Sequence, residues 1–382
     1  MADIPNDGLV GLTDAQPRGG FGKMPNAPHQ TFHGFMTGGP YELAIVEFDD
    51  QGRCYDRGQM DGIAARLDKL RADETDVIIA VFVHGWKHDA RTDDDNLCNF
   101  RTLLSDVARY EQDHTAPGAT KRPVLGIFVG WRGLLEYGND LIEGATFWDR
   151  QGAGLRVSWG SVRELFGRLR HYRNHQLKYH KSPLLVIAGH SFGGMVVYSA
   201  LAQSLIEAAS APADTLIPSL ADLVLLINPA FEGERFLPIY DLISADAFQN
   251  RGITQLPVFV CAQANNDFPV GKLFPLGAKP GSLLEAALGD LETRCITTAL
   301  GFVDEFRTHQ LDAPNGGEPF VLNPPGETQV NPYWVVGATQ PVINDHGGIW
   351  QDPFKAFLAW LVFQHVEGSK LQDSSRVKAR NV

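Results

Sequence analysis

The sequence predicts an α/β protein in which a mostly parallel central sheet carries helices on both faces, with cap-like insertions. Two observations predict this class. Short apolar runs recur along the chain, and each is continuous rather than alternating, as in strands that are buried on both faces. Helical patterns separate several of these runs, and repeated alternation of strand and helix indicates a parallel sheet.

The expected elements follow one another along the chain. A strand is expected at 42–48, ELAIVEF, because turn residues follow it, and a helix at 58–72, where apolar residues recur at helical spacing. Further strands are expected at the apolar runs 77–83, 124–129, 184–189, 223–228, 258–262 and 333–338. Further helices are expected at 94–111, 161–173 and 195–208, and a final buried helix is expected from Asp352.

The pattern also divides the chain into regions. Residues 1–40 are rich in Gly, Pro and Asn and predict an irregular N-terminal arm. One α/β domain is expected over 41–366, with insertions at about 131–182 and 266–330 that exceed ordinary connections and are candidates for a cap. Residues 367–382 are expected to form a polar C-terminal tail.

Composition narrows the classes of function. The chain has 382 residues with 44% hydrophobic side chains, enough for a large core, and a formal net charge of -12. An acidic surface repels phosphate backbones, so non-specific nucleic-acid binding is not expected. We expect no membrane span, because no window approaches the roughly 20 apolar residues that a membrane helix needs. We expect a cytoplasmic location, because the N-terminus has no basic segment followed by an apolar stretch. A signal peptide that has been removed stays an open alternative, and so does the oligomeric state.

The four cysteines give no sign of a metal or redox site. Cys54, Cys98, Cys261 and Cys295 are far apart and form no CxxC pair. Cys261 lies in an apolar run and is expected to be a small buried residue, while one or two disulfides stay open. No HExxH or P-loop motif is present, so we expect no metal and no organic cofactor.

Three weaker patterns have simpler interpretations. His171 and His175 could face one metal ion, but their basic surroundings, RLRHYRNHQLKYHK, favour a solvated helix face. That basic stretch could attract an acidic substrate group, a hypothesis that rests on charge alone. The segment 152–154 begins like a dinucleotide fingerprint, but Val157 stands where the third glycine belongs. The acidic run 93–95 precedes a helical pattern and is expected to cap it.

The strongest motif is GHSFG at 189–193, between an expected strand and an expected helix. A serine hydroxyl is a weak nucleophile that must be exposed beside a base. A sharp strand-to-helix turn lifts Ser191 above the edge of the sheet, and small neighbours tolerate the tight backbone. The competing interpretation is a structural turn in which the serine merely caps the helix.

With this motif, the chain resembles the α/β-hydrolase fold, and within it the serine esterases and lipases, over about 41–366. The resemblance indicates no subfamily. It implies a serine carboxylic-ester hydrolase that forms an acyl-enzyme, acts on a small-molecule ester and needs no cofactor. The alternatives are another acyl-transfer enzyme, such as an amidase, thioesterase or acyltransferase, and a non-catalytic scaffold on the same fold.

The resemblance also implies roles for particular residues. Ser191 would be the nucleophile, Asp267 the acid that follows the run 258–262, and His346, in NDHGGIW, the general base. This is the family's order of Ser, acid and His. Asp267 could instead be a solvated turn residue and His346 a surface histidine. Asp345 is a poor partner for the imidazole, because neighbouring side chains of extended backbone point apart.

Other residues complete the expected site. The resemblance implies that the backbone N–H groups of Trp86, after the His-Gly pair of VFVHGW, and of Phe192 form the oxyanion hole. His84 is expected to be structural. His190, Phe268 and Trp350 are candidates for the substrate pocket, which would suit an ester that is partly apolar or aromatic. The competing interpretation is that these aromatic residues belong to the core.

Overall fold

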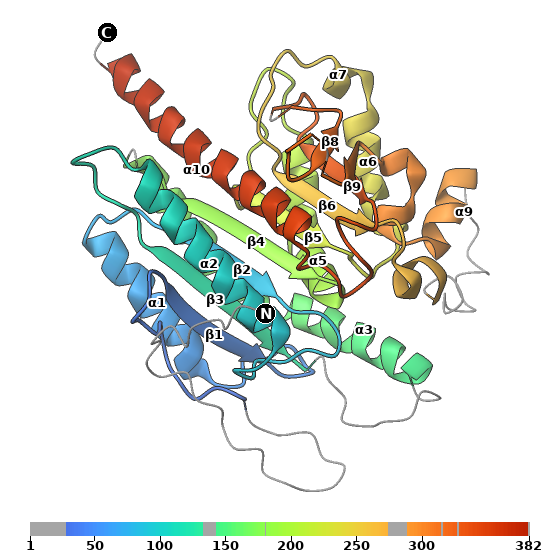
Figure 1. Cartoon of the computed structure of the whole chain (residues 1–382), viewed down its shortest axis with the longest axis horizontal. Helices are drawn as coiled ribbons and strands as arrows, with labels where there is room; N and C mark the ends of the chain where they lie inside the picture. Colours follow the sequence, from blue (N-terminus) through green and yellow to red (C-terminus); the bar gives the residue numbers. More distant parts are fainter. Residues whose placement is uncertain are drawn as a thin grey trace, which may run out of the picture. The chain divides into compact units, whose positions relative to one another are not determined.

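The computed structural model describes residues 28–132, 143–179, 181–273, 289–314, 316–326 and 328–380. These residues form two compact units. The first unit holds the described residues up to Ala188 and those from Val362 on, and the second runs from Gly189 to Leu361. Each unit has strands and helices that alternate along the chain (Figure 1).

In the sheet of the first unit, the strand pairs whose registers are defined are parallel. Its strands lie in the order β1 (Glu42–Phe48), β3 (Val124–Trp131), β2 (Ile78–Val83) and β4 (Leu184–His190). β3 pairs in parallel with both β1 and β2. Nearly every side chain of these strands is buried, which explains their continuous apolar sequences. The last two residues of β4 belong to the second unit.

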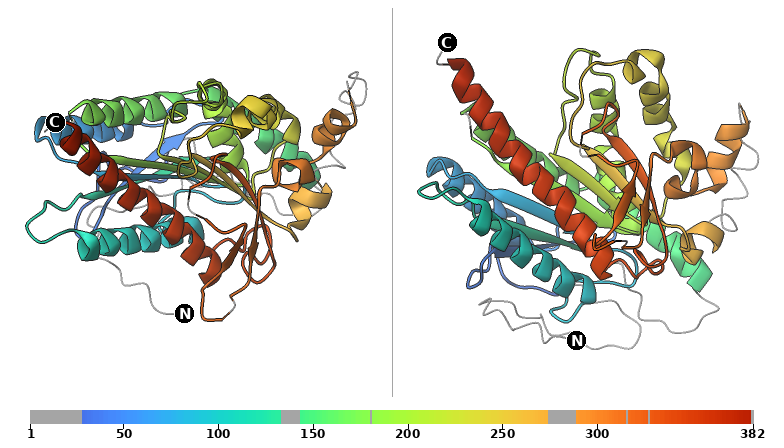
Figure 2. Two further views of the ribbon diagram at one scale, coloured as in Figure 1. Left: turned by 90° about the horizontal axis from the view of Figure 1, so that it is seen from above. Right: turned by 45° about the horizontal axis from the view of Figure 1, so that its top comes forward.

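Helices cover both faces of this first sheet. α1 (Arg57–Ala72) packs against β1 and α4 (Val162–Lys178), whereas α2 (Asp95–His114) packs against β3 on the opposite face (Figure 2, left). α3 (Glu143–Trp159) precedes α4. Asp94 caps α2, because its side chain accepts hydrogen bonds from two N–H groups of the first turn. The capping role expected of the acidic run 93–95 is therefore confirmed.

The second unit contains the remaining strands. They lie in the order β5 (Leu223–Ile227), β6 (Phe259–Ala264), β9 (Tyr333–Ala338), β7 (His309–Asp312) and β8 (Val321–Asn323). Neighbours are parallel from β5 through β7, and only the pair β7 and β8 is antiparallel. The carboxyl ends of β5, β6 and β9 therefore meet at one edge, where open α/β sheets bind ligands.

The helices of this unit include one that is apolar nearly all round. In the described residues they are α5 (Phe192–Ala209), α6 (Leu237–Ser244), α7 (Asp246–Gln249), α9 (Asp290–Thr297) and the start of α10 (Asp352–Arg380). α5 packs against β5 and α6. Among the described residues it alone has the length and apolar composition of a membrane span, and 61% of it is buried inside the protein. A mostly buried helix of this composition is typical of a core.

The α/β fold class and the mostly parallel sheet are confirmed, and each expected strand is present. The expected helices at 58–72, 94–111, 161–173 and 195–208 are also present. α10 continues through the residues expected as a polar tail. The described part of the N-terminal arm, 28–40, has no helix and only isolated bridges. The division into one domain with two insertions stays a prediction.

Candidate active site

Ser191 occupies a strained turn at the carboxyl end of β4. Its backbone has φ 56° and ψ -123°, and it directly precedes the first residue of α5. A positive φ is costly for a residue with a Cβ, and such strain persists where surrounding contacts fix it. Here the Ser191 N–H donates to Ile227 O at 2.9 Å, and its carbonyl accepts from Ala230 N–H at 3.2 Å. The turn is therefore fastened to the end of β5.

Gly189 shows why the motif needs a small residue before the serine. A Cβ at Gly189 would lie 2.5 Å from Gly193 O and 2.8 Å from Gly194 N. Both are backbone atoms of α5, so they could not swing aside as a flexible side chain would. The absent side chain lets the first turn of α5 fold back against the end of β4, which raises Ser191 at the edge.

The structure brings Ser191, His346 and Asp267 together. His346 Nε2 lies 2.8 Å from Ser191 Oγ, and His346 Nδ1 lies 2.7 Å from Asp267 Oδ2. Because a carboxylate only accepts, Nδ1–H donates to Asp267, and Nε2 is left to accept from the serine hydroxyl. This is the tautomer in which the imidazole can remove the serine proton.

Asp267 is a fixed acceptor rather than a solvated turn residue. Its side chain is buried, and Oδ2 also accepts from Gln263 Nε2 at 3.0 Å. The other oxygen, Oδ1, accepts from Val270 N–H at 3.0 Å. Three donors thus hold the carboxylate, and the ring of His346 has one preferred orientation against it.

Side chains from three places hold the loop that carries His346. Asn266 Nδ2 donates to Asn344 O, and His190 Nε2 donates to His346 O at 2.9 Å. Asn228 Nδ2 donates to His346 O at 2.9 Å and to Asp345 O at 3.2 Å. The backbone of the loop is therefore anchored at three successive carbonyls.

Asn228 connects this loop to the acid, and sequence reasoning missed it. It is fully buried at the end of β5 with φ 45°, a conformation that asparagine tolerates better than most residues. Its Oδ1 accepts from Ala264 N–H at 2.8 Å and from Gln263 Nε2 at 3.4 Å. The signal in the sequence was a polar residue, followed by proline, at the end of an apolar strand.

Asp345 does not serve the imidazole. Its Oδ1 accepts from Gly348 N–H at 2.6 Å, which closes a local turn on the far side of His346. A Cβ at Gly348 would come within 3.0 Å of the Asp345 nitrogen, so the second glycine of NDHGG lets the turn close. The expectation that adjacency would not make Asp345 a partner agrees with this geometry.

The two expected oxyanion donors lie in different units. Phe192 is the first residue of α5, where the backbone N–H groups point out of the end of the helix. Trp86 belongs to the first unit, in the turn after β2, and its contribution to the site stays a prediction.

His84, two residues before Trp86, is a structural histidine. It is fully buried, its Nε2 accepts from Trp131 N–H at 3.1 Å, and its Nδ1–H donates to Gly85 O at 2.8 Å. Burial lowers the pKa of His84 to about 4. The imidazole is therefore neutral at pH 7 and keeps both hydrogen bonds.

The three expected pocket residues differ in exposure. His190 is buried and supports the His346 loop, as described above. Phe268 is exposed, with 58% of its surface accessible, and Trp350 is half-buried. An exposed phenylalanine directly after Asp267 is available to an apolar ligand. Their contact with substrate stays a prediction.

The described residues contain neither a cluster of metal ligands nor a disulfide. Within the described ranges, no group of three or more His, Cys, Asp or Glu side chains could hold a metal ion. All four cysteines are free thiols. Cys261 is fully buried in β6, as expected, and burial raises the pKa of its thiol far above the usual range.

No protein family model matches the chain, and no curated protein matches it. Two similar solved structures are of phospholipase PlaB from Legionella pneumophila, one of them in complex with thio-NAD. The complex has 12% sequence identity and a TM-score of 0.31, and the match covers 78% of this chain and 62% of that chain. The other has 11% identity and a TM-score of 0.29, with 78% and 63% covered. The chain thus spans less than two thirds of either structure, and likeness at this level assigns no family.

Proposed function

We propose that this protein is a serine carboxylic-ester hydrolase with Ser191 as nucleophile, His346 as general base and Asp267 as the acid. The observation that supports this most is the continuous chain of hydrogen bonds from Ser191 Oγ through the imidazole to Asp267 Oδ2. A serine that only capped a helix would bond to backbone N–H groups, and Ser191 makes no such bond to α5.

The reaction would proceed in two halves. His346 Nε2 takes the hydroxyl proton as Ser191 Oγ attacks the ester carbonyl, and the imidazolium that forms is stabilised by Asp267. The oxyanion gains stabilisation from Phe192 N–H, at the positive end of α5. His346 then returns the proton to the leaving alcohol, and the acyl group stays on the serine. Water, activated by the same imidazole, releases the acid and restores the hydroxyl.

A fluorophosphonate probe tests the nucleophile directly. Such probes phosphonylate a serine that is activated by a base, so the wild-type protein should be labelled at Ser191 and Ser191→Ala should not. Ser158 is a suitable control because it is buried and bonds locally to Leu155 O at 2.7 Å. Ser158→Ala should label like wild type. Absence of wild-type labelling, or equal labelling of Ser191→Ala, would contradict the proposal.

The substrate class is tested with matched acyl compounds. We expect p-nitrophenyl esters of graded chain length to be hydrolysed with a preference for apolar acyl groups, because Phe268 offers exposed apolar surface beside Asp267. Anilides and thioesters of the same acids serve as comparators. Faster turnover of either comparator would reassign the enzyme to the amidases or thioesterases, and indifference to chain length would contradict an apolar pocket.

A further inference from the structure

A basic groove lies between α1 and α4 in the first unit. Its cavity has a volume of about 520 Å³, within the range of small-molecule sites. Cationic or imidazole side chains dominate its lining: Arg71 from α1, and Arg168, Arg170, His171, His175 and Lys178 from α4. Asp68 is the one carboxylate among the lining residues. In a chain of net charge -12, this concentration of positive charge is unusual.

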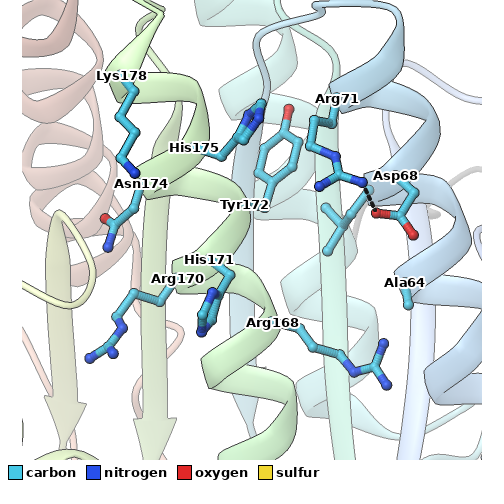
Figure 3. A pocket seen from close by; sticks show the side chains of 11 residues that line it. Ala64, Asp68, Arg71, Arg168, Arg170, His171, Tyr172, Asn174, His175 and Lys178 are labelled. Carbon is cyan, nitrogen blue, oxygen red and sulfur yellow. Dashed lines mark ion pairs between the residues drawn. The ribbon is translucent and has the colours of Figure 1, made fainter.

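Part of this charge is already compensated. Arg71 pairs with Asp68 at 3.0 Å, and Arg168 pairs with Glu164 at 2.9 Å. The pair of Arg71 and Asp68 is drawn in Figure 3. The remaining cations, Arg170 and Lys178, form no ion pair or hydrogen bond with the described part of the chain.

Glu164 does not offset these two free charges. Arg57 binds its carboxylate in a fork at 2.7 and 2.9 Å, and Arg168 also donates to its Oε1 at 3.0 Å. Arg57 and then Arg168 lower the pKa of Glu164 to about 2. This carboxylate is fully engaged outside the groove, and it fixes α1 to α4 at one end.

The donors repeat along α4 with helical spacing. Arg170, Asn174 and Lys178 follow one another along one side of the helix (Figure 3). His171 and His175 form a second row, also one turn apart. One turn rises about 5.4 Å, so the groove presents positive and N–H groups at successive levels rather than at one point. His175 Nδ1 is buried and has no hydrogen-bond partner among the described residues.

These features differ from an ordinary solvated helix face. The neighbouring side of α4 is buried and anchored, because Tyr172 Oη–H and Gln176 Nε2 both donate to Thr75 O, at 2.8 and 3.1 Å. The row of Arg170, Asn174 and Lys178 is therefore carried by an anchored helix, on the side of α4 away from α1 (Figure 3). Arg170 and Lys178, which have no carboxylate partner among the described residues, together with the imidazole groups, are suited to an anion that accepts several charge-assisted hydrogen bonds.

We propose that the groove between α1 and α4 binds a ligand that carries at least two phosphate groups. Each phosphate would accept from donors of a different turn, and the volume accommodates more than one such group. The ligand's source is either a soluble polyphosphorylated molecule or the head group of an anionic phospholipid. This site is built entirely from the first unit and does not depend on the proposed hydrolase activity.

Inorganic tripolyphosphate is the first probe, measured against the full chain by titration calorimetry at low salt. We expect saturable binding at one site that weakens as salt rises. The double variant Arg170→Gln with Lys178→Gln should bind at least about tenfold more weakly, because two charge-assisted contacts are lost. Both side chains are exposed, so the variant should fold; an unchanged melting temperature checks this.

A second double variant controls for general surface charge. Arg163→Gln with Lys121→Gln removes the same charge from exposed positions that do not line the groove. It should bind tripolyphosphate within about twofold of wild type, since it keeps every lining donor. Equal weakening in the two double variants would overturn the proposal, and so would the absence of saturable binding to the wild-type protein.

Vesicles distinguish the two sources of phosphate. The wild-type protein is sedimented with vesicles of phosphatidylcholine alone and of phosphatidylcholine mixed with cardiolipin, whose head group carries two phosphates. Binding to the anionic vesicles that tripolyphosphate competes away, and that Arg170→Gln with Lys178→Gln abolishes, assigns the site to a lipid head group. Binding of tripolyphosphate without vesicle binding assigns it to a soluble ligand.

Discussion

The carboxylate of Asp267 faces three hydrogen-bond donors, and this makes its charge hard to replace. In Asp267→Asn the amide NH₂ would face one of the donors that now reach Oδ1 and Oδ2. We expect kcat for p-nitrophenyl esters to fall by about 10⁴-fold, the scale known for serine proteases whose triad acid becomes an amide. A rate within tenfold of wild type would move the acid to another residue.

Asn228 is expected to act on the reaction through His346. Asn228→Ala removes the amide that holds the Asp345 and His346 carbonyls, so the imidazole loses part of its alignment. We expect kcat to fall by about 100-fold with little change in KM, because small misplacements of a reacting group are costly. Stopped assays at several ester concentrations separate the two constants.

Asn228→Gly separates lost positioning from backbone strain. Alanine at φ 45° is strained, whereas glycine adopts this conformation at little cost. If alignment by the amide is what matters, the glycine and alanine variants should lose kcat equally. Recovery of kcat in the glycine variant would show that strain, and not the lost hydrogen bonds, caused the defect.

Two glycines, one in the turn from β4 into α5 and one inside α4, allow a matched pair of substitutions that tests how these elements pack. In Gly189→Ala the new Cβ would meet the backbone of α5 at 2.5 Å. We expect the free energy of unfolding to fall by about 1–3 kcal/mol, as overpacking usually costs, and activity to fall as Ser191 shifts. Urea unfolding followed by circular dichroism measures the first effect.

Gly167→Ala is the counterpart within α4. A Cβ there meets nothing within 4 Å, and the residue lies in the helix interior. We expect this substitution to raise the free energy of unfolding by about 0.5–1 kcal/mol, because alanine restricts the unfolded chain more than glycine does. Loss of stability at Gly167, or none at Gly189, would be inconsistent with the packing described for these elements.

The sequence predicted the elements that recur in a strong pattern and missed the others. β7 and β8 have four and three residues, too few to show a period, and α6 and α7, with eight and four residues, are shorter than the helices that a pattern identifies. α3 lies in a segment whose pattern did not suggest a helix. Only chain order and a family resemblance predict the site residues on loops far apart in the chain, since no local pattern connects residue 346 to residue 191.

What sequence reasoning could not supply is the support around the site. In the sequence, nothing distinguishes Asn228, Gln263 and Asn266 from other polar residues. Only the fold shows that their amides converge on the His346 loop and on Asp267. His190 was expected in the substrate pocket from its place in the motif. Its hydrogen bond to the His346 carbonyl depends on a contact across 156 positions, which no short-range signal reports.

For the whole molecule, two buried histidines predict how stability depends on pH. Burial lowers the pKa of both His84 and His309 to about 4 from the usual value of 6.5. As the pH falls from about 6.5 to about 4, the unfolded chain takes up protons that the folded chain does not. The contribution of these two histidines to the free energy of unfolding should therefore be greatest above about pH 6.5. It should decrease as the pH falls from about 6.5 to about 4, and change no further below about pH 4.

His309→Phe tests this dependence with little change in packing. His309 stacks against Trp334 with ring centroids 4.2 Å apart, and its Nε2 is buried without a partner among the described residues. Phenylalanine keeps the ring and removes the titration. Urea unfolding at about pH 7 and about pH 5 should show a smaller loss of stability in the variant than in wild type. Equal losses of stability in the variant and in wild type would mean that other groups cause the decrease in stability between about pH 7 and about pH 5.

The separation of 155 positions between Ser191 and His346 has a consequence for biosynthesis. A ribosome makes the proposed nucleophile first, the proposed acid next and the proposed base last, so we expect a nascent chain to carry an unactivated serine until residue 346 has emerged. Fragments that end before that residue should be inert toward acylating reagents. We therefore expect Ser191 to become reactive late in synthesis. By then the strands from β5 to β9 have been made and can position the groups that hydrogen-bond to one another in the site.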